Sequence, residues 1–230
     1  QAVERLSQIC KESNIVIPVG KDSLSMSTKW GKKYSNEVKS PLSLILSAFA
    51  SINDVDKYVT PYTNKKSQLF LVDLGRGKDR MGGSGLDQTL SYTNHKAPNI
   101  NQLDDLLNYF EFTQELVRKN LLNAYHDRSD GGLITTLMEM AFVSNMSVDL
   151  KNVSSKSKIE LIRFLFNEEL GGVFAIDRKY QKEFIKLTQK YNLETTTHYI
   201  GDISKKEKPI LTIASCNYSE PISKLRKYWS

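Results

Sequence analysis

The segment His126 to Gly132 (His-Asp-Arg-Ser-Asp-Gly-Gly) concentrates residue types that can bind a phosphate and its metal ion. An apolar run at helical spacing follows it, so we expect a loop that opens a helix, where free backbone N–H groups suit a phosphate. Asp127 and Asp130 are ligands of the kind that Mg²⁺ takes together with phosphate oxygens, and Ser129 adds a hydroxyl donor. Gly131 and the glycine after it allow close backbone approach and unusual dihedral angles. The alternative is an ordinary capped helix, because Ser or Asp begins many helices.

A second polar loop, Gly20-Lys21-Asp22-Ser23, follows a short apolar run. Gly20 permits close approach of a phosphate, Lys21 supplies a compact positive charge, Asp22 can bind Mg²⁺ and Ser23 can donate a hydrogen bond. The spacing is not that of a P-loop. A plain β-turn is an equal alternative, since Gly, Asp and Ser are common turn residues for backbone reasons alone.

Three further features are open to a functional or a structural interpretation. For Gly82-Gly83-Ser84 we favour a flexible connecting loop over a phosphate clamp. For His126 we favour a structural role, since no Cys or Ser nucleophile is plainly paired with it. Glu168 and Glu169 follow a helical pattern, and we expect solvated charges at a helix end; the alternative is that one of them orients a basic side chain in the site.

Hydrophobic periodicity predicts helices and strands mixed along the whole chain, which indicates an α/β (α+β) architecture. The expected helices cover 2–12, 103–122, 159–166 and 179–191, with another after the loop at 126–132. The expected strands cover 15–17, 42–50 (a buried strand), 68–74, 173–176, 196–200 and 210–213. Residues 60–67 are polar and carry no period, so we place a domain boundary there.

The composition is that of an ordinary globular protein. The 230 residues suffice for one large or two small domains, and no run approaches the roughly 20 apolar residues of a membrane span. The net charge of +6 comes from scattered lysines without interleaved aromatic residues, so we expect a solvated surface and no nucleic-acid partner. Cys10 and Cys216 are far apart and lack metal spacing; we expect two reduced, half-buried thiols in a cytoplasmic protein. The chain opens without Met or a signal peptide, which suggests a piece of a longer polypeptide.

The segment Tyr125 to Leu133 resembles the D-x-S-D-G-G signature of the aminoimidazole ribonucleotide synthetase superfamily of ATP-dependent enzymes. Further segments, in the same order, resemble the phosphoribosylformylglycinamidine synthase family in its large single-chain form. They are Pro18 to Met26 followed by Ser40 to Leu44, then Met81 to Ser84, and Phe166 to Gly171. The resemblance covers about Ile9 to Ile176 and extends more weakly to the C-terminus.

The resemblance implies that residues 1–60 are the end of an ATP-binding synthetase subdomain and that 66–230 form the synthetase C-terminal-like domain. It implies an ATP-dependent ligase of de novo purine biosynthesis, with Mg²⁺ and ATP as cofactors. That enzyme converts formylglycinamide ribonucleotide and glutamine-derived ammonia to formylglycinamidine ribonucleotide. The expected partners are the remaining domains of a parent chain, among them a glutaminase domain.

The resemblance also suggests roles for single residues. Asp127 matches a Mg²⁺ ligand and Ser129 an ATP contact, in a nucleotide site that can be auxiliary rather than catalytic. The smaller form of the family has Gly-Asn-Val-Ser at the first loop, which places Gly20 at ATP and Ser23 at the substrate. Lys21 stands where that form has a metal-binding Asn, so the metal role there would pass to its neighbour Asp22 or to the Lys ammonium itself.

Other functions share some of these features. A non-catalytic nucleotide-binding or assembly module would need the same loops without the chemistry. A kinase of the superfamily, such as thiamine-phosphate kinase, shares D-x-S-D-G but not the segment from Gly20 to Met26. The sequence contains no visible glutaminase nucleophile, so we expect this chain alone to be inactive. A site shared with another half of the parent also predicts an exposed apolar face and a tendency to dimerise.

Overall fold

The structure is a computed structural model that describes residues 2–21, 26–40, 43–52, 54–153 and 157–229. It divides into two compact units, Gln1–Asp54 and Val55–Ser230. Asp22 and Ser23, both expected in the first polar loop, lie outside the described residues.

The part of the first unit that the structure describes contains one helix and one β-hairpin. Helix α1 (Ala2–Ser13) confirms the helix expected at 2–12. Strands β1 (Ser27–Trp30) and β2 (Asn36–Lys39) pair antiparallel around the short 3₁₀ turn η1 (Lys32–Tyr34), and both strands are exposed along their whole length.

Two strands that we expected in the first unit are absent from its described part. Residues 15–17 and 43–50 form no regular structure. The run at 43–50 is exposed rather than buried, with Ile45 87% and Phe49 96% accessible. A strand needs a neighbour to satisfy its backbone groups, and among the described residues the sheet of β1 and β2 has only those two strands. Apolar composition alone therefore gave the wrong prediction for these segments.

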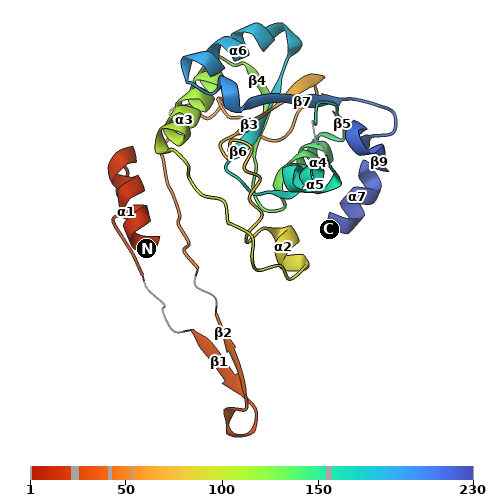
Figure 1. Ribbon diagram of the computed structural model, residues 1–230. Helices are drawn as coiled ribbons and strands as arrows, with labels where there is room; N and C mark the ends of the chain where they lie inside the picture. The colour runs from red at the N-terminus through yellow and green to blue at the C-terminus, as the bar shows by residue number, and fades with distance from the viewer. Residues whose placement is uncertain (1, 22–25, 41–42, 53, 154–156, 230) are drawn as a thin grey trace. The chain divides into compact units, whose positions relative to one another are not determined.

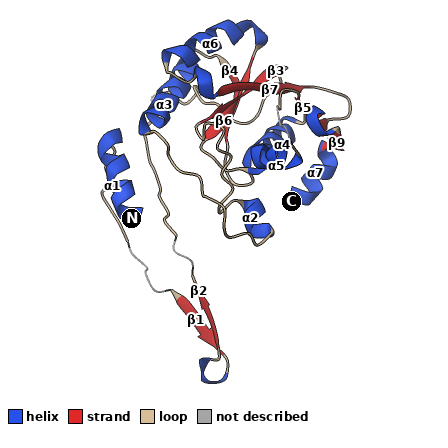
Figure 2. Ribbon diagram, in the orientation of Figure 1, coloured by secondary structure: helices blue, strands red, loops and turns tan. Residues whose placement is uncertain are grey.

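The second unit is built on a seven-stranded sheet with the order β4-β6-β3-β7-β5-β8-β9 (Figures 1 and 2). All neighbours are antiparallel except β5 and β8, which are parallel. The strands are β3 (Ser67–Asp73), β4 (Leu122–Asp127), β5 (Ser147–Leu150), β6 (Gly171–Ile176), β7 (Thr197–Ser204), β8 (Ile210–Ile213) and β9 (Tyr218–Pro221). The helices are α2 (Gly85–Thr89), α3 (Leu103–Arg118), α4 (Gly132–Ser144), α5 (Lys158–Phe166), α6 (Gln181–Lys190) and α7 (Ile222–Trp229), with 3₁₀ turns η2 (Arg178–Tyr180), η3 (Glu194–Thr196) and η4 (Ala214–Cys216).

Helices cover both faces of this sheet, so the second unit has three layers. Strand β3 shows why its sequence is apolar without interruption. Leu69 and Leu71 point into the core that α4, α5 and α7 cover, whereas Phe70 and Val72 point into the core under α3 and α6. A strand that is buried on both faces cannot alternate polar and apolar residues. The predicted mixed α/β fold class is confirmed.

Most elements expected in this unit are confirmed within a few residues, and one boundary was wrong. The helix expected over 103–122 ends at Arg118, and the chain then forms strand β4. Lys119 and Asn120 make the turn between them, with Asn120 at a φ of 54°. Leu121 and Leu122 continued the apolar period of the helix, which concealed the boundary.

The polar residues 60–67 are held by the second unit. The Thr60 carbonyl accepts a hydrogen bond from the backbone N–H of Tyr125, and the N–H of the buried Thr63 donates to Ser144 Oγ. Elsewhere, Cys10 is half-buried as expected, but Cys216 is exposed, since it lies in the turn before β9. No helix in the described ranges has the length and apolar composition needed to cross a membrane.

Candidate functional site

The signature segment joins the edge strand β4 to helix α4. His126 and Asp127 are the last residues of the strand, so the loop that we expected at 126–132 is shorter and begins at Arg128. Side chains alternate along a strand, which sends these two residues to opposite faces of the sheet. His126 Nε2 lies 2.7 Å from Glu139 Oε2 of α4, in a pocket that Phe142 and Trp229 also line.

The start of α4 differs from both sequence-based interpretations. Gly131 is the residue before the helix, and its φ of 82° confirms the unusual dihedral angles expected there, as does the φ of 72° at Gly132. No side chain caps this helix through a hydrogen bond, so the alternative of a Ser or Asp cap was wrong. Instead, Glu168 Oε1 accepts the N–H of Gly131 and the N–H of Gly85 at the start of α2, each at 2.8 Å. An N–H group that we expected to be free for a phosphate therefore already binds a carboxylate.

Ser129 and Asp130 lie on the exposed side of this loop. The carbonyl of Ser129 accepts the N–H of Gly132 at 2.9 Å, which fixes the tight turn into α4. The structure therefore brings three predicted site residues together at one end of the sheet: Asp127 at the end of β4, and Ser129 and Gly131 in the loop.

Arg128 points in the opposite direction and is buried below the loop. Its Nη2 lies 2.5 Å from Asp73 Oδ1, and its Nε and Nη2 donate to the carbonyls of Glu169 and Leu170 at 2.7 and 3.1 Å. The same Asp73 carboxylate accepts the N–H groups of Gly75 and Gly77. These bonds hold the end of β3, the end of β4 and the start of β6 at fixed positions, and the loop bearing Ser129 rests on them.

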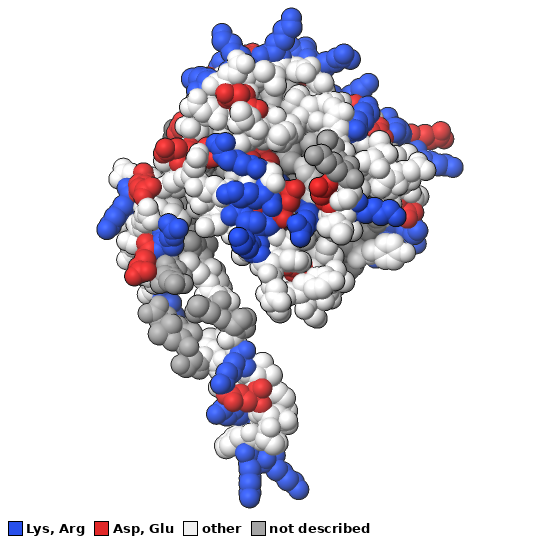
Figure 3. Space-filling model, viewed as in Figure 1, with Lys and Arg blue, Asp and Glu red and all other residues white. Residues whose placement is uncertain are grey.

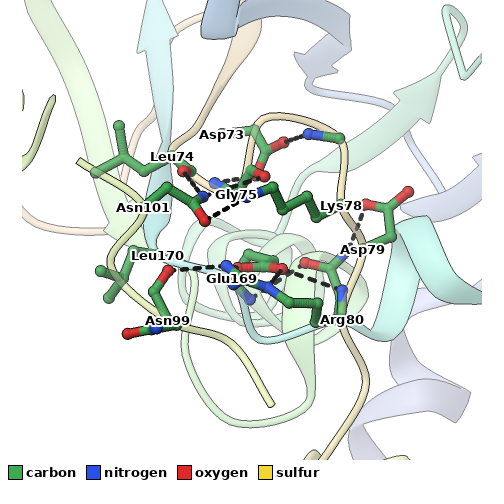
Figure 4. Close-up of polar contacts among 12 residues, drawn as sticks. Asp73, Leu74, Gly75, Lys78, Asp79, Arg80, Asn99, Asn101, Glu169 and Leu170 are labelled. Atoms are coloured by element: carbon green, nitrogen blue, oxygen red, sulfur yellow. Dashed lines mark hydrogen bonds and ion pairs between the residues drawn. The ribbon is translucent and has the colours of Figure 1, made fainter. Parts of the chain in front are cut away.

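Glu169 was expected as a solvated charge at a helix end, and that prediction was wrong. Its side chain is 1% exposed and forms a two-pronged ion pair with Arg80, with Nε–Oε1 and Nη2–Oε2 distances of 2.6 Å (Figure 4). This bond raises the pKa of the Arg80 guanidinium. The ion pair confirms that one of the two glutamates orients a basic side chain, and the place of this pair in a functional site stays a prediction.

The glycine-rich loop before α2 lies beside this cluster. The Gly82 N–H donates to the Lys96 carbonyl, and Ser84 Oγ accepts the N–H of Asp87 as the cap of α2. Residues 82–84 thus lie in the loop that leads into α2, and the predicted flexibility of this loop stays a prediction. Nearby, Asn101 donates to the Leu74 carbonyl (Figure 4). The pKa of Asp79 is raised, first by burial and then by the charge of Asp73.

Two tyrosines that the sequence gave no reason to select stand next to Asp127. The Tyr125 hydroxyl donates to Asp127 Oδ1, and the Tyr125 and Tyr109 hydroxyl oxygens are 2.7 Å apart. Burial raises the pKa of both hydroxyls. The period-2 relation of Tyr125 to Asp127 would have predicted this contact, had β4 been recognised as a strand.

The structure offers no preformed metal cage in the ranges that it describes, where no three His, Cys, Asp or Glu side chains converge. The donor set does fit an ion that arrives with a nucleotide. Asp127 and Asp130 are exposed carboxylates at one loop, and Mg²⁺ is commonly held by one or two carboxylates plus phosphate oxygens.

The other predicted residues belong to the first unit. Gly20 and Lys21 are exposed and lie outside any helix or strand. Asp22 and Ser23, as noted, are beyond the described ranges, so their predicted metal and substrate roles remain predictions.

Family models of known proteins match part of each unit. Residues 1–51 match the model of the FGAR-AT PurM_N-like domain, and residues 72–214 match that of the AIR synthase related protein, C-terminal domain. Similar solved structures include T. maritima PurL complexed with ATP, 13% identical, with a TM-score of 0.55 over 82% of this chain and 28% of that chain. T. maritima PurL complexed with FGAR is also 13% identical, with a TM-score of 0.55 over 74% and 30% of the two chains. At these identities the likeness shows the fold, and the chain spans less than a third of the length of these structures.

Proposed function

Because the chain belongs to the AIR synthase related family, whose C-terminal domain it contains, we propose that it is part of an ATP-dependent, amidine-forming ligase. The reaction is the conversion of formylglycinamide ribonucleotide and ammonia to formylglycinamidine ribonucleotide in purine biosynthesis. The observation that carries the proposal is the order of the two matches, an FGAR-AT PurM_N-like domain followed by the AIR synthase related C-terminal domain. We place the ligase in the cytoplasm.

The proposed chemistry transfers the γ-phosphoryl group of ATP to the amide oxygen of the substrate. Ammonia then attacks the activated carbon, and the C–O bond breaks to release phosphate, so the products are the amidine, ADP and phosphate. Mg²⁺, when bound, neutralises charge on the phosphoryl oxygens. In this chain Asp127 would hold an ion at the signature loop, and Asp22 would be a metal ligand in the first polar loop. Ser129 would donate to the nucleotide.

The remaining predicted contacts are assigned by position. Gly20 in the first polar loop and Gly131 in the signature loop would each let the backbone approach a phosphate, and Lys21 would supply positive charge in the first polar loop. Ser23 would contact the ribonucleotide substrate. The occupied N–H of Gly131 means that a phosphate at this loop would either bind beside Glu168 or displace it.

The ligase as a whole would require other parts of a parent chain. The chain spans less than a third of the solved PurL structures, so glutamine hydrolysis and the rest of the ATP site would come from elsewhere. We therefore expect the 230 residues alone to be catalytically silent. The test supplies ammonium salt in place of glutamine, together with ATP, Mg²⁺ and formylglycinamide ribonucleotide. Product formation by the purified chain would overturn this part of the proposal.

A non-catalytic nucleotide site is the second candidate function. The observation that favours it is the contact of Glu168 Oε1 with the N–H groups of Gly131, at the start of α4, and Gly85, at the start of α2. A structural site needs no access for a reacting substrate, so this contact can persist there. Ammonium-dependent turnover by the parent protein carrying Asp127→Ala separates the two. Turnover that survives while the nucleotide is lost would favour the structural site.

Nucleotide binding itself is tested by calorimetry of the parent protein with MgADP. Asp127→Ala should weaken binding about tenfold or more, because a metal ligand is lost (about 1.4 kcal/mol per tenfold). Glu207→Ala is the matched control, since Glu207 is an exposed acid in the turn between β7 and β8. Equal MgADP affinity for Asp127→Ala and the control would contradict the assignment of Asp127.

A further inference from the structure

We propose that Tyr109 and Tyr125 form a one-directional hydroxyl relay that positions the carboxylate of Asp127 for a nucleotide-bound metal ion; this rests on the function proposed above for Asp127. Tyr109 lies outside the signature segment, and Tyr125 opens that segment without being one of the D-x-S-D-G-G positions. Tyr109 comes from α3 and Tyr125 from β4, so the relay connects the metal loop to the helical layer behind it.

The direction of the relay follows from the number of protons that each group can donate. An ionised carboxylate can only accept hydrogen bonds, so the Tyr125 hydroxyl must donate its single proton to Asp127 Oδ1. The Tyr125 hydroxyl then has no second proton to donate. The 2.7 Å contact between the two tyrosines therefore requires Tyr109 to donate to the Tyr125 oxygen. Two aligned O–H dipoles thus end on one carboxylate oxygen, and bonds in such a chain polarise one another.

The surroundings hold both rings in place. Tyr109 is 8% exposed, and its ring meets Phe174 edge-on at 5.8 Å, while the Tyr125 ring lies 4.9 Å from the same Phe174. Strand β6 has Gly172 directly beneath them. A Cβ there would lie 2.4 Å from the Tyr109 hydroxyl oxygen, so only glycine leaves room for the hydroxyl pair without a shift.

The contacts of the pair suit a relay of donors. Each phenol has one proton to donate and an ionised carboxylate has none, so both hydroxyls donate toward Asp127. The bond to Oδ1 also fixes the rotation of the Asp127 carboxylate, which leaves Oδ2 for a cation on the exposed side.

A group that orients a metal ligand affects metal affinity without touching the metal. Changes to such partners usually cost about 10- to 100-fold in metal affinity. We expect Tyr125→Phe to weaken MgADP binding about tenfold, because Asp127 loses its direct donor. Tyr109→Phe should have a smaller effect in the same direction. The double variant should resemble Tyr125→Phe alone, because Tyr109 acts only through Tyr125.

The test measures ADP affinity by calorimetry with Mg²⁺ and again with EDTA, for the wild-type parent protein and for the same protein carrying each tyrosine substitution, both together, or Asp127→Asn. A positioning role lowers the Mg²⁺-dependent gain in affinity and leaves the affinity in EDTA unchanged. Tyr191→Phe is the matched control, since the Tyr191 hydroxyl also donates to a carboxylate, at 2.6 Å from Glu115 Oε2, but on another part of α3. Circular dichroism confirms the fold of each variant, and Tyr109→Phe, which keeps the Tyr125–Asp127 bond, serves if Tyr125→Phe does not fold.

The outcomes separate the relay from the proposed function. A Mg²⁺-dependent gain that falls in Asp127→Asn and in Tyr125→Phe, but not in Tyr191→Phe, supports the relay. If the gain falls in Asp127→Asn but is unchanged in both tyrosine variants, the relay is wrong and the proposed role of Asp127 stands. If Asp127→Asn retains the full gain, or the wild type shows none, the proposed metal role fails and the relay fails with it.

Discussion

Arg128 shows how the charges of the signature segment are divided between binding and architecture. Asp127 and Ser129 face solvent on either side of it, whereas the Arg128 side chain is buried against Asp73 and two carbonyl groups. A buried guanidinium is tolerated only when its charge is paired and its N–H groups are bonded. Nη1 finds no partner among the residues that the structure describes, so the network is held by the other two nitrogens.

Removing this guanidinium should destabilise the second unit. Arg128→Met leaves the Asp73 carboxylate buried without its cation, which typically costs about 3–5 kcal/mol. Arg118→Met is the matched control, because Arg118 is exposed and lies 4.0 Å from the exposed Glu111; it should cost under about 1 kcal/mol. Urea unfolding followed by circular dichroism measures both. Adding Asp73→Asn to Arg128→Met should restore part of the loss, and similar losses for the two single arginine variants would contradict the prediction.

For single residues, the sequence predicted site residues that are adjacent in the chain. It did not predict contacts between residues that are far apart in the chain. Asp127, Ser129 and Gly131 were found because they are adjacent and their types suit a phosphate and Mg²⁺. The burial of Glu169 depends on Arg80, 89 positions away, and no local signal connects the two. The Tyr109 contact with Tyr125 depends on α3 packing over β4, which only the tertiary structure supplies.

Helices α3 and α6 pack on the same face of the sheet, and a cluster of polar bonds joins their outer surfaces. Phe112 and Phe184 meet below it at 5.4 Å. Above them, Glu115 accepts from Lys190 at 2.5 Å and from the Tyr191 hydroxyl at 2.6 Å. The bond from Lys190 is the main cause that lowers the pKa of Glu115 to about 2.

This depressed pKa predicts how the contact depends on pH. A carboxylate whose pKa is lower in the folded chain contributes stability above its unfolded pKa, near 4.5. That contribution is lost as the pH falls from 4.5 toward about 2. Glu115→Gln should therefore cost about 1 kcal/mol at pH 7, because Lys190 and Lys119 are partly exposed. The difference should shrink at pH 3, measured by urea unfolding of both proteins at each pH; a constant difference would contradict the assignment.

Two apolar runs of similar composition show why one strand was predicted correctly and another was not. Residues Gln68 to Asp73 of the first run lie in the sheet strand β3, because β6 and β7 pair with it on either side. Residues 43–50 are as hydrophobic but form no strand, because no neighbour in the described part of the first unit pairs with them. Periodicity reports what a segment can bury, whereas pairing decides whether it becomes a strand.

Across the molecule, charge and apolar surface are distributed differently. On the visible face of the second unit, Lys and Arg side chains are interspersed with Asp and Glu (Figure 3). The first unit contains several exposed apolar side chains close together in sequence: Leu44 (57% exposed), Ile45 (87%), Leu46 (58%) and Phe49 (96%). Exposed apolar runs of this kind are typical of surfaces that associate with another chain.

We therefore expect the full chain to self-associate through residues 43–50. Burying side chains such as Ile45 and Phe49 contributes about 1.5–3 kcal/mol each, enough for two such residues to shift a weak dimer by orders of magnitude. Sedimentation velocity over a range of concentrations should show a dimer for the wild-type chain. The double variant Ile45→Ser/Phe49→Ser should be largely monomeric. Phe110→Ser is the matched control, because Phe110 is an exposed aromatic residue (58%) on α3 of the second unit, and it should leave the association unchanged. A wild-type chain that stays monomeric, or a double variant that associates equally well, would show that this apolar run is not a contact surface between copies.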